Sequence, residues 1–388
     1  MRSVELFGGA GGLAMGVAAA GFTHDAVIEW DRHACATLRE NKIRGVKPIQ
    51  DWPLFEADIK TFDYSRIPAG VDLVSGGPPC QPFSIGGKHS GFRDNRNMFP
   101  EAVRAVRELK PRAFVFENVR GLLRQSFTEY FEYIKFQLTY PTVVRKADED
   151  WQLHLMRLQQ HHTSSPHRGL RYNVVSGVFN AANFGVPQKR DRVFIVGFRY
   201  DLNVQWSFPA ATHSHDALLW KKWVTGEYWD VHRIPKKHRQ ELTREIAKRV
   251  ERLRVVGEPT SKPWKTVRDA IGDLPVPTSR QPCLLLNHAY QPGARRYAGH
   301  TGSPLDEAAK TLKAGDHGVP GGENMLALPT GEVRYFTVRE SARLQTFPDD
   351  VYFPESWTET MRQLGNAVPM ELAEVLVQSI ARHLDLRQ

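Results

Sequence analysis

The first half of the chain alternates short apolar runs with stretches of helical periodicity. Brief runs rich in Val, Phe or Ile predict buried strands at Val4–Phe7, Ala26–Glu29, Val71–Ser75, Ala113–Glu117, Val174–Phe179 and Val193–Phe198. The intervening periodic stretches predict helices at Leu13–Ala20, Ala34–Asn41 and Pro100–Leu109. This alternation predicts an α/β fold with a parallel, doubly wound sheet. In such sheets, ligands gather at the carboxyl ends of the strands.

The pattern becomes irregular after Phe198, where prolines, glycines and aromatic residues break the chain into short segments. Helices are predicted again only near the end, at Thr337–Thr346 and at the amphipathic stretch Glu371–Leu384. The predicted organisation is a first domain, a loop-rich second domain, a return segment and a piece that completes the first domain: 1–198, 199–336, 337–362 and 363–388.

A polar stretch at His161–Arg168 contains three histidines. They lack the accompanying cysteines or carboxylates that are typical of a metal site. The stretch is therefore interpreted as an exposed loop, and no metal cofactor is predicted.

The composition is that of an ordinary globular protein, with 41% hydrophobic and 24% charged residues. The cysteines Cys35, Cys80 and Cys283 are too few for a disulfide framework, which favours a reducing, cytoplasmic setting. The glycines between Gly8 and Gly16 are more typical of a turn after a strand than of a signal peptide. No apolar run reaches the about 20 residues that a membrane span needs.

The net charge of +9 is compatible with a polyanionic partner, and its distribution adds to that indication. Residues 198–334 contain 21 Lys and Arg against 15 Asp and Glu. Within them, the stretch Arg233–Arg254 is especially basic and is a candidate for contacts with a nucleic acid. A solvated helix supported by Glu–Arg pairs would show the same local pattern.

The segment from Phe7 to Gly12 places four glycines between a predicted strand and a predicted helix. Glycines let the backbone approach a ligand closely. Glu29, about 20 residues further on at the end of the next strand, is the expected partner for a ribose hydroxyl, and Trp30 could stack on adenine. The spacing departs from the dinucleotide fingerprint, so a nucleoside cofactor without a pyrophosphate is favoured over a glycine turn with no ligand.

Gly76–Ser84 follows another predicted strand and holds Cys80 between prolines at 78, 79 and 82. Prolines stiffen the backbone, and rigid presentation of one thiol suits a nucleophile better than a packing residue. A lone cysteine without this setting would more often be a small buried hydrophobe. The glycine-containing polar stretch Ile85–Asn97 is predicted to be a mobile lid.

Together these segments resemble the cytosine-C5 DNA methyltransferase family of bacterial restriction-modification systems. The motifs that carry the resemblance span nearly the whole chain in family order: Phe7–Gly12, Glu29–Trp30, Asp58–Ile59, Gly77–Ser84, Glu117–Val119, Gln188–Arg192, Arg339–Gln345 and Gly365–Pro369. The resemblance implies a Rossmann-like, S-adenosylmethionine-dependent methyltransferase domain and a smaller target-recognition domain, at 199–336.

The resemblance also implies the chemistry. Cys80 would attack carbon 6 of cytosine as a thiolate and make carbon 5 nucleophilic. Glu117 would hold the N3 and N4 edge of the base, while Arg192 and, more distantly, Arg190 would steady its carbonyl and phosphate side. Since none of this can occur inside a stacked duplex, the target base must be flipped out. The base that removes the carbon 5 proton has no candidate.

For the S-adenosylmethionine site, the resemblance assigns residues from five of these motifs, together with Phe99. They are Phe7, Gly9 and Gly11 at the methionine end, Glu29 and Trp30 at the ribose and adenine, Asp58 and Ile59 at the adenine edge and face, Pro79 and Phe99 near the cofactor, and Asn366 and Val368 at the methionine group. Ile59 and Phe99 are equally typical of plain core residues.

The favoured function is therefore methylation of carbon 5 of a cytosine in a specific double-stranded DNA site. A restriction endonuclease that cuts the same site would be the partner, without a stable complex. The alternatives are an RNA cytosine methyltransferase, such as the transfer-RNA branch of the family, and a DNA-binding protein without catalysis. The long basic insert favours DNA, and the presence of Cys80, Glu117 and Arg192 together favours an enzyme.

Overall fold

The computed structural model describes residues 1–79, 97–164, 169–279, 284–298, 300–314 and 322–385. The chain forms two compact units. The first comprises Met1–Phe179, Asp191–Pro209 and Ala373–Gln388. The second comprises Asn180–Arg190 and Ala210–Leu372. The recognition role assigned to 199–336 stays a prediction.

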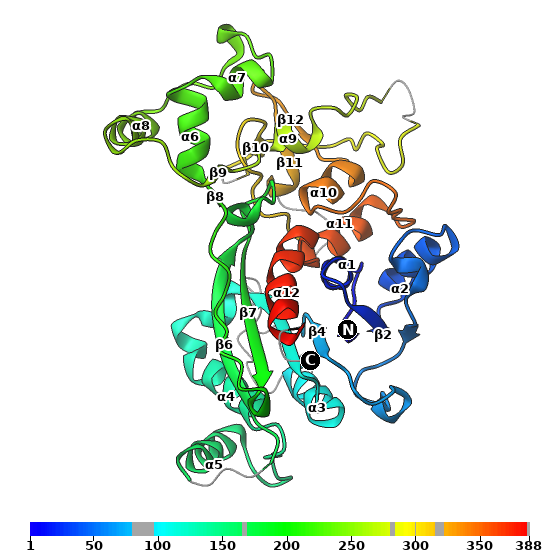
Figure 1. The fold of residues 1–388 in the computed structure, drawn as a ribbon. Helices are drawn as coiled ribbons and strands as arrows, with labels where there is room; N and C mark the ends of the chain where they lie inside the picture. Colours follow the sequence, from blue (N-terminus) through cyan, green and yellow to red (C-terminus); the bar gives the residue numbers. More distant parts are fainter. Residues whose placement is uncertain (80–96, 165–168, 280–283, 299, 315–321, 386–388) are drawn as a thin grey trace. The chain divides into compact units, whose positions relative to one another are not determined.

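A seven-stranded sheet with the order β3-β2-β1-β4-β5-β7-β6 is the frame of the first unit (Figure 1). The strands are β1 (Arg2–Leu6), β2 (Thr23–Glu29), β3 (Leu54–Glu56), β4 (Leu73–Gly76), β5 (Ala113–Val119), β6 (Tyr172–Asn180) and β7 (Asp191–Arg199). All six strands predicted in this region are present. The short β3 was missed because its three residues carry no clear period.

The sheet is mixed, which corrects the prediction of an all-parallel one. β1, β2, β3, β4 and β5 pair in parallel, whereas β7 runs antiparallel to β5. The chain between β5 and β7 includes β6 and two helices. Alternation of strands and helices in the sequence therefore could not determine the direction in which β7 enters the sheet.

The strand order reverses between β1 and β4, which makes the carboxyl ends of these two strands a switch point where ligands bind in such folds. The two strands approach closely at that end. A Cβ atom on Gly76 would lie 2.6 Å from the carbonyl oxygen of Leu6. Glycine is therefore required at position 76, where the chain leaves β4 and enters the predicted Cys80 loop, Gly76–Ser84.

Helices complete the first unit: α1 (Gly12–Ala19), α2 (Arg32–Ile43), α3 (Phe99–Leu109), α4 (Thr128–Thr139), α5 (Trp151–Thr163) and α12 (Met370–Asp385). The predicted helices Leu13–Ala20, Ala34–Asn41, Pro100–Leu109 and Glu371–Leu384 agree with α1, α2, α3 and α12 to within two residues at each end. A large apolar cluster joins β1, β4 and β5 to α3, α4 and α5. No helix in the described part of the chain is long and apolar enough to cross a membrane.

The predicted loop at His161–Arg168 was wrong for its first residues. His161 and His162 belong to α5, and their rings pack edge-on against Tyr140. His162 also forms a hydrogen bond with the Tyr140 hydroxyl, at 2.7 Å. His167 lies outside the described residues. A short helix is predicted near Trp151–Leu158, and α5 extends it to Thr163, where the helix packs against Tyr140, the residue that follows α4.

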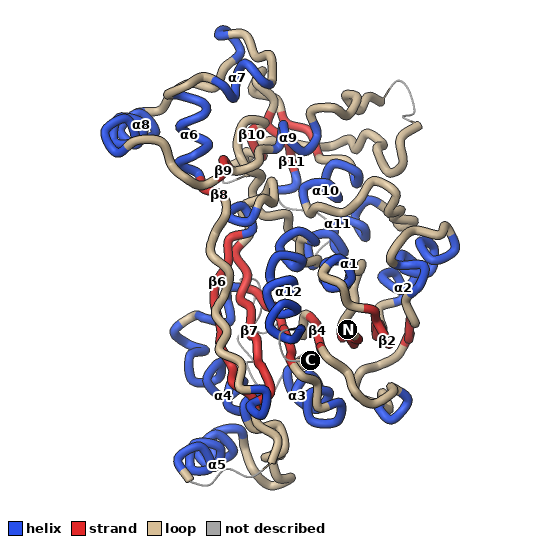
Figure 2. Tube along the Cα trace, viewed as in Figure 1, coloured by secondary structure: helices blue, strands red, loops and turns tan. Residues whose placement is uncertain are grey.

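The second unit is rich in loops between short elements (Figure 2). Its helices are α6 (His215–Trp223), α7 (Glu227–Val231), α8 (Arg244–Val256), α9 (Val267–Ile271), α10 (Val338–Leu344) and α11 (Trp357–Asn366). Its strands are β8 (His213–Ser214), β9 (Lys262–Pro263), β10 (Ser303–Pro304), β11 (Met325–Ala327) and β12 (Val333–Tyr335). Thr337 is the N-cap residue of α10 and forms a capping box with Glu340. This helix corresponds to the one predicted at Thr337–Thr346.

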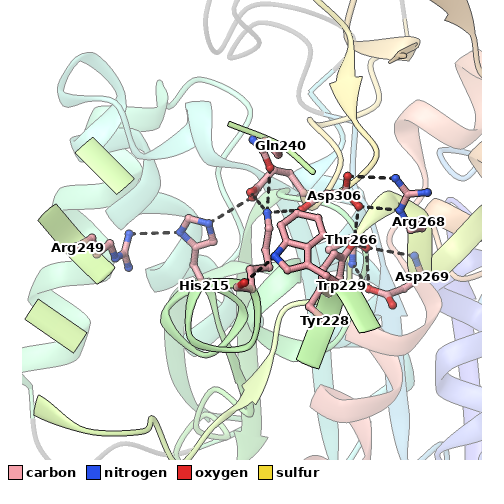
Figure 3. A network of polar contacts seen from close by, with 11 residues as sticks. His215, Tyr228, Trp229, Gln240, Arg249, Thr266, Arg268, Asp269 and Asp306 are labelled. Carbon is pink, nitrogen blue, oxygen red and sulfur yellow. Dashed lines mark hydrogen bonds and ion pairs between the residues drawn. The ribbon is translucent and has the colours of Figure 1, made fainter. Parts of the chain in front are cut away.

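A buried lysine organises the helical part of this unit. The ammonium group of Lys222, which is 2% exposed, donates to Glu307 Oε1 at 2.7 Å, to the Asp306 carbonyl at 2.8 Å and to Gln240 Oε1 at 3.0 Å. Figure 3 shows the surrounding polar network. Burial raises the pKa of Glu307, but the hydrogen bond from His215 and the Lys222 charge outweigh it and lower that pKa to about 2.

Replacing Lys222 with Met should destabilise the second unit, because the carboxylate of Glu307 would lose its buried cation. Breaking a buried ion pair by removing one partner costs about 3 kcal/mol or more. Denaturant unfolding should show this loss. Lys221→Met is the matched control, since Lys221 pairs with the exposed carboxylates of Glu227 and Glu258 and its loss should change stability little. Equal effects of the two substitutions would contradict the prediction.

Candidate active site at the carboxyl edge of the sheet

The glycine-rich loop after β1 has a backbone that only particular residues tolerate. Phe7, Gly9 and Gly11 have φ angles of 57°, 52° and 90°, in the left-handed region. A Cβ on Gly11 would lie 3.0 Å from the Trp52 ring, so packing also requires glycine there. At Gly9, by contrast, a Cβ would meet no described atom within 4 Å. The loop therefore combines a strained backbone with open space beside Gly9, which fits close approach of a ligand.

Glu29, at the end of β2, holds this loop in place. Its side chain is buried, and Oε2 accepts a hydrogen bond from the Gly9 amide at 2.7 Å. Oε1 accepts from the amides of Trp30 at 2.8 Å and Asp31 at 2.7 Å. The carboxylate predicted to bind ribose is thus fixed at the edge of the glycine loop.

The other residues predicted on the nucleoside side differ in exposure. The Trp30 ring is 69% exposed, so it is accessible to a planar group. Asp58 is exposed and accepts a hydrogen bond from the Lys60 amide at 2.9 Å. Ile59 and Phe99 are buried members of the apolar cluster, which agrees with the core role that each could have. The fit to a nucleoside cofactor therefore depends on the glycine loop and Glu29.

Glu117, in the last half of β5, forms an ion pair with Arg192 at the start of β7. The distance from Glu117 Oε1 to Arg192 Nε is 2.7 Å, and both side chains are buried. Burial lowers the pKa of the Arg192 guanidinium, and the charges of Glu117 and Asp191 oppose that shift. The antiparallel register of β5 and β7, which pairs Glu117 with Phe194 and Val119 with Arg192, brings the two charges together.

The same carboxylate lies against the loop that follows β4. A Cβ on Gly77 would be 3.3 Å from Glu117 Oε2. The neighbouring Asn118 donates from Nδ2 to the Pro78 carbonyl at 2.9 Å. The Gly77–Pro79 segment and the Glu117–Arg192 pair therefore form one site at the end of β4 and β5.

Cys80 and the stretch predicted as a lid up to residue 96 lie outside the described residues. Pro79, which precedes Cys80 in the chain, is exposed, and its carbonyl accepts a hydrogen bond from the Met98 amide at 3.3 Å. The described residues on both sides of this stretch are thus joined at the site.

Arg190 was predicted to act on the carbonyl and phosphate side of the base more distantly than Arg192, and that role stays a prediction. The Arg190 side chain is fully buried in the second unit, and the guanidinium donates to the carbonyls of Leu312, Gly365 and Ala367. The alternation of side chains between the two faces of a strand does not apply to Arg190. β7 begins at Asp191, so Arg190 belongs to the segment before the strand. Of the residues at the predicted methionine end, Asn366 is exposed and Val368 is 5% exposed.

Sequence reasoning missed Glu5, which lies inside β1 two residues before Phe7. It is 1% exposed, and the Ser75 hydroxyl of β4 donates to its carboxyl group. Burial raises the pKa of Glu5 to about 8, and the bond from Ser75 opposes the shift. The sequence feature that could have revealed Glu5 is an acidic residue inside an otherwise apolar predicted strand.

Comparison with solved structures establishes the class of fold. The S. pombe Dnmt2 methyltransferase superposes over 100% of this chain and 98% of its own, with a TM-score of 0.54 and 16% sequence identity. The fold is thus the Rossmann-like methyltransferase fold, and the predicted fold class is confirmed.

The family is shown by sequence. The model of the C-5 cytosine-specific DNA methylase family matches residues 1–140 and 163–382. The chain is 32% identical to the type II methyltransferase M.PspPI of Psychrobacter sp. over 98% of its length and 79% of that protein. It is also 32% identical to the type II methyltransferase M.Eco47II of Escherichia coli, with the same coverage. The protein belongs to the C-5 cytosine-specific DNA methylase family.

Membership confirms the predicted enzyme class, a DNA cytosine-C5 methyltransferase, over an RNA enzyme or a binding protein without catalysis. The family implies S-adenosylmethionine as methyl donor and DNA as substrate. Among the described residues, no group of three or more His, Cys, Asp or Glu could hold a metal ion.

Replacing Glu5 with Gln should change how stability depends on pH. Between pH 4.5 and about 8 the unfolded chain ionises Glu5 while the folded protein keeps it protonated, so wild-type stability falls as pH rises through this window. At about 1.4 kcal/mol per pKa unit, the loss over this window is at most roughly 5 kcal/mol. The Glu5→Gln variant should not show this loss of stability as pH rises.

Urea unfolding at several pH values from 5 to 8 measures this difference. Glu40→Gln is the control, because Glu40 pairs with Arg44 on the surface of α2 and should leave the wild-type pH profile unchanged. Parallel profiles for wild type and Glu5→Gln would show that Glu5 ionises normally in the folded protein.

Proposed function

We propose that the protein methylates carbon 5 of a flipped cytosine within one specific double-stranded DNA site, as the modification enzyme of a restriction-modification system. The observation that carries the proposal is the Glu117–Arg192 pair, 2.7 Å apart, against the segment that leads into Cys80. The relatives M.PspPI and M.Eco47II are type II methyltransferases, which supports the biological setting.

The cofactor site is proposed at the switch point between β1 and β4. Gly9 and Gly11 would let the methionine part pass close to the backbone beside Phe7, and Glu29 would bind the ribose hydroxyls. Trp30 and Asp58 would border the adenine, with Ile59 behind it. Pro79, Phe99, Asn366 and Val368 complete the proposed set. S-adenosylmethionine supplies an electrophilic methyl group to this site.

In the proposed reaction, the Cys80 thiolate forms a bond with carbon 6 of cytosine, and the electron pair of the 5,6 double bond moves to carbon 5. Carbon 5 takes the methyl group as the bond between that methyl and the sulfonium sulfur breaks, which leaves S-adenosylhomocysteine as the second product. Loss of the carbon 5 proton then restores the double bond as the Cys80 thiolate leaves. Cys80 is thus regenerated, and one proton is released for each methyl group transferred.

Glu117 and Arg192 would stabilise the base while this occurs. The carboxyl oxygen of Glu117 that lies near Gly77 would face N3 and the N4 amino group of the base. A proton held at N3 would neutralise the charge that develops there. Arg192 would donate to the base carbonyl while keeping its contact with Glu117. Because the pair is buried before the base arrives, little reorganisation is needed when it binds.

The DNA contacts are proposed in the second unit, within 199–336. A restriction endonuclease that cleaves the same site would be the functional partner without a stable complex, and the substrate places the enzyme in the cytoplasm. In the predicted basic stretch Arg233–Arg254, some of the cations have carboxylate partners. Arg249 and Arg254 are paired with Asp216 and Glu251. Arg239 lies 3.6 Å from Asp230, whereas Lys236 and Lys237 are exposed and available to phosphates.

Replacing Cys80 with Ser should abolish methylation, by at least about a thousandfold, because the hydroxyl is a far weaker nucleophile. Bisulfite sequencing of DNA from cells that express each form measures this and also identifies the site. Wild type should protect cytosines in one recurring sequence. Binding of S-adenosylhomocysteine, followed by calorimetry, should stay within about twofold in the variant.

Cys35→Ala is the matched control. Cys35 is buried in α2, where burial raises the pKa of its thiol to about 12, so it should be dispensable for methylation. Methylation by Cys80→Ser, or the absence of a covalent adduct between the wild-type enzyme and 5-fluorocytosine DNA, would refute the proposed role of Cys80.

Replacing both Lys236 and Lys237 with Gln should weaken DNA binding and reduce its dependence on salt. Both residues are exposed, and among the described residues neither ammonium group has a hydrogen bond or an ion pair. If each contacts one phosphate, the slope of log K against log salt should fall by about 2. Fluorescence anisotropy of a labelled duplex measures the slope.

Arg254→Gln provides the comparison, since its guanidinium is already paired with Glu251 and its removal should alter the slope less. A slope that is unchanged in the double variant would show that Lys236 and Lys237 belong to a solvated face of the protein.

A further inference from the structure

Three polar side chains are completely buried together in the second unit. Gln188, Arg190 and Gln345 each have 0% exposure, and all three are joined by hydrogen bonds to segments far away in the sequence. Burying polar groups is costly unless their hydrogen bonds are made. This cluster therefore determines how several segments lie relative to one another.

Arg190 contacts two such segments. Its Nη1 donates to the Leu312 carbonyl at 3.2 Å, while Nη2 donates to the carbonyls of Gly365 at 2.7 Å and Ala367 at 2.9 Å. Two different nitrogens of the planar guanidinium make these bonds in fixed directions, and a lysine, with its donors on one nitrogen, could not reproduce this geometry. One side chain thus connects 312 with 365–367.

The two glutamines make the same connection from either side. Gln188 accepts from the Leu312 amide at 2.9 Å and donates to Gln345 Oε1 at 3.0 Å. Gln345 in turn donates to the carbonyls of Leu364 and Ala367. The cluster therefore links 312 to 364–367 by two routes, through Arg190 and through the glutamine pair.

The two segments are also in direct backbone contact. A Cβ on Gly365 would lie 2.3 Å from the Ala314 nitrogen, so a side chain there would force them apart. The 309–314 segment is further attached through the Lys189 amide, which donates to the Ala309 carbonyl at 2.8 Å, and through Thr311 Oγ1, which donates to the Lys189 carbonyl at 2.7 Å. Movement of 365–367 must therefore disturb 309–314.

Asn366 is exposed between the two carbonyls that Arg190 holds. We propose that Arg190 is a positioning residue that couples cofactor binding at Asn366 and Val368 to the 309–314 segment of the proposed recognition domain. The inference rests on the proposed cofactor site. A ligand that orders 365–367 would thereby order 309–314, and DNA contacts that order 309–314 would favour cofactor binding to the same extent.

Hydrogen exchange with the cofactor product alone tests this coupling without DNA. The amides of Ala309, Leu312 and Lys313 are hydrogen-bonded, so their exchange reports opening of the segment. Saturating S-adenosylhomocysteine should slow exchange in the peptide that covers 309–314 about tenfold in wild type. In Arg190→Lys the slowing should fall below about twofold, while calorimetry still shows that the product binds.

Arg339→Lys is the matched control. Arg339 is 2% exposed and also donates to three backbone carbonyls of the same unit, those of Leu286, Pro348 and Val351. It should cost comparable stability but keep the tenfold protection of 309–314. If Arg190→Lys does not fold, Gln345→Met removes the second donor to Ala367 and should reduce the protection in the same way.

The outcomes separate the coupling from the function it rests on. Binding of S-adenosylhomocysteine without protection of 309–314 in wild type, or full protection in a folded Arg190→Lys, overturns the coupling alone. If wild type fails to bind S-adenosylhomocysteine, the proposed cofactor site fails, and the coupling fails with it.

Discussion

The ion pair between Glu117 and Arg192 is the interaction on which the proposed active site depends. It exists because β7 enters the sheet antiparallel to β5, which sets the beginning of one strand beside the end of the other. Two opposite charges in a buried place stabilise each other but lose hydration. That balance keeps a carboxylate where a pyrimidine edge would need one, next to the segment that leads to Cys80.

Three glutamates near the carboxyl edge of the sheet are treated in three different ways. Glu5 is buried beside Ser75, and its raised pKa keeps it largely protonated at neutral pH. Glu29 accepts backbone amide hydrogen bonds and shapes the glycine loop. Glu117 is held by Arg192. Residues of one chemical type therefore serve as a neutral core group, a loop clamp and a proposed base-binding group according to their surroundings.

In the second unit, buried cations replace regular secondary structure as the organising element. Lys222 joins the helical part to Asp306 and Glu307, whereas Arg190 and Arg339 each gather three carbonyls from separate loops. A loop-rich region has many backbone carbonyls without partners in helices or sheets, and these need donors when buried. Long basic side chains supply them, so part of this unit's positive charge is used internally.

The sequence by itself determined the family, most of the strands and helices in the first unit, and the identity of the chemical groups. These features depend on local patterns: the apolar runs, the glycines before α1 and the prolines around Cys80. The pairing of the glycine loop with Glu29 is a further case. The loop follows β1, Glu29 ends β2, and the number of residues between them can be read from the sequence.

Only the tertiary structure decided the direction of β7, the contact of Glu117 with Arg192 and the burial of Arg190 against backbone carbonyls of the second unit. Arg190 and Arg192 are two residues apart and both match the family motif, yet one reaches into the second unit's loops while the other meets β5. Such roles depend on partners more than a hundred residues away, Leu312 and Gly365 for Arg190, and a local pattern carries no information about contacts at that separation.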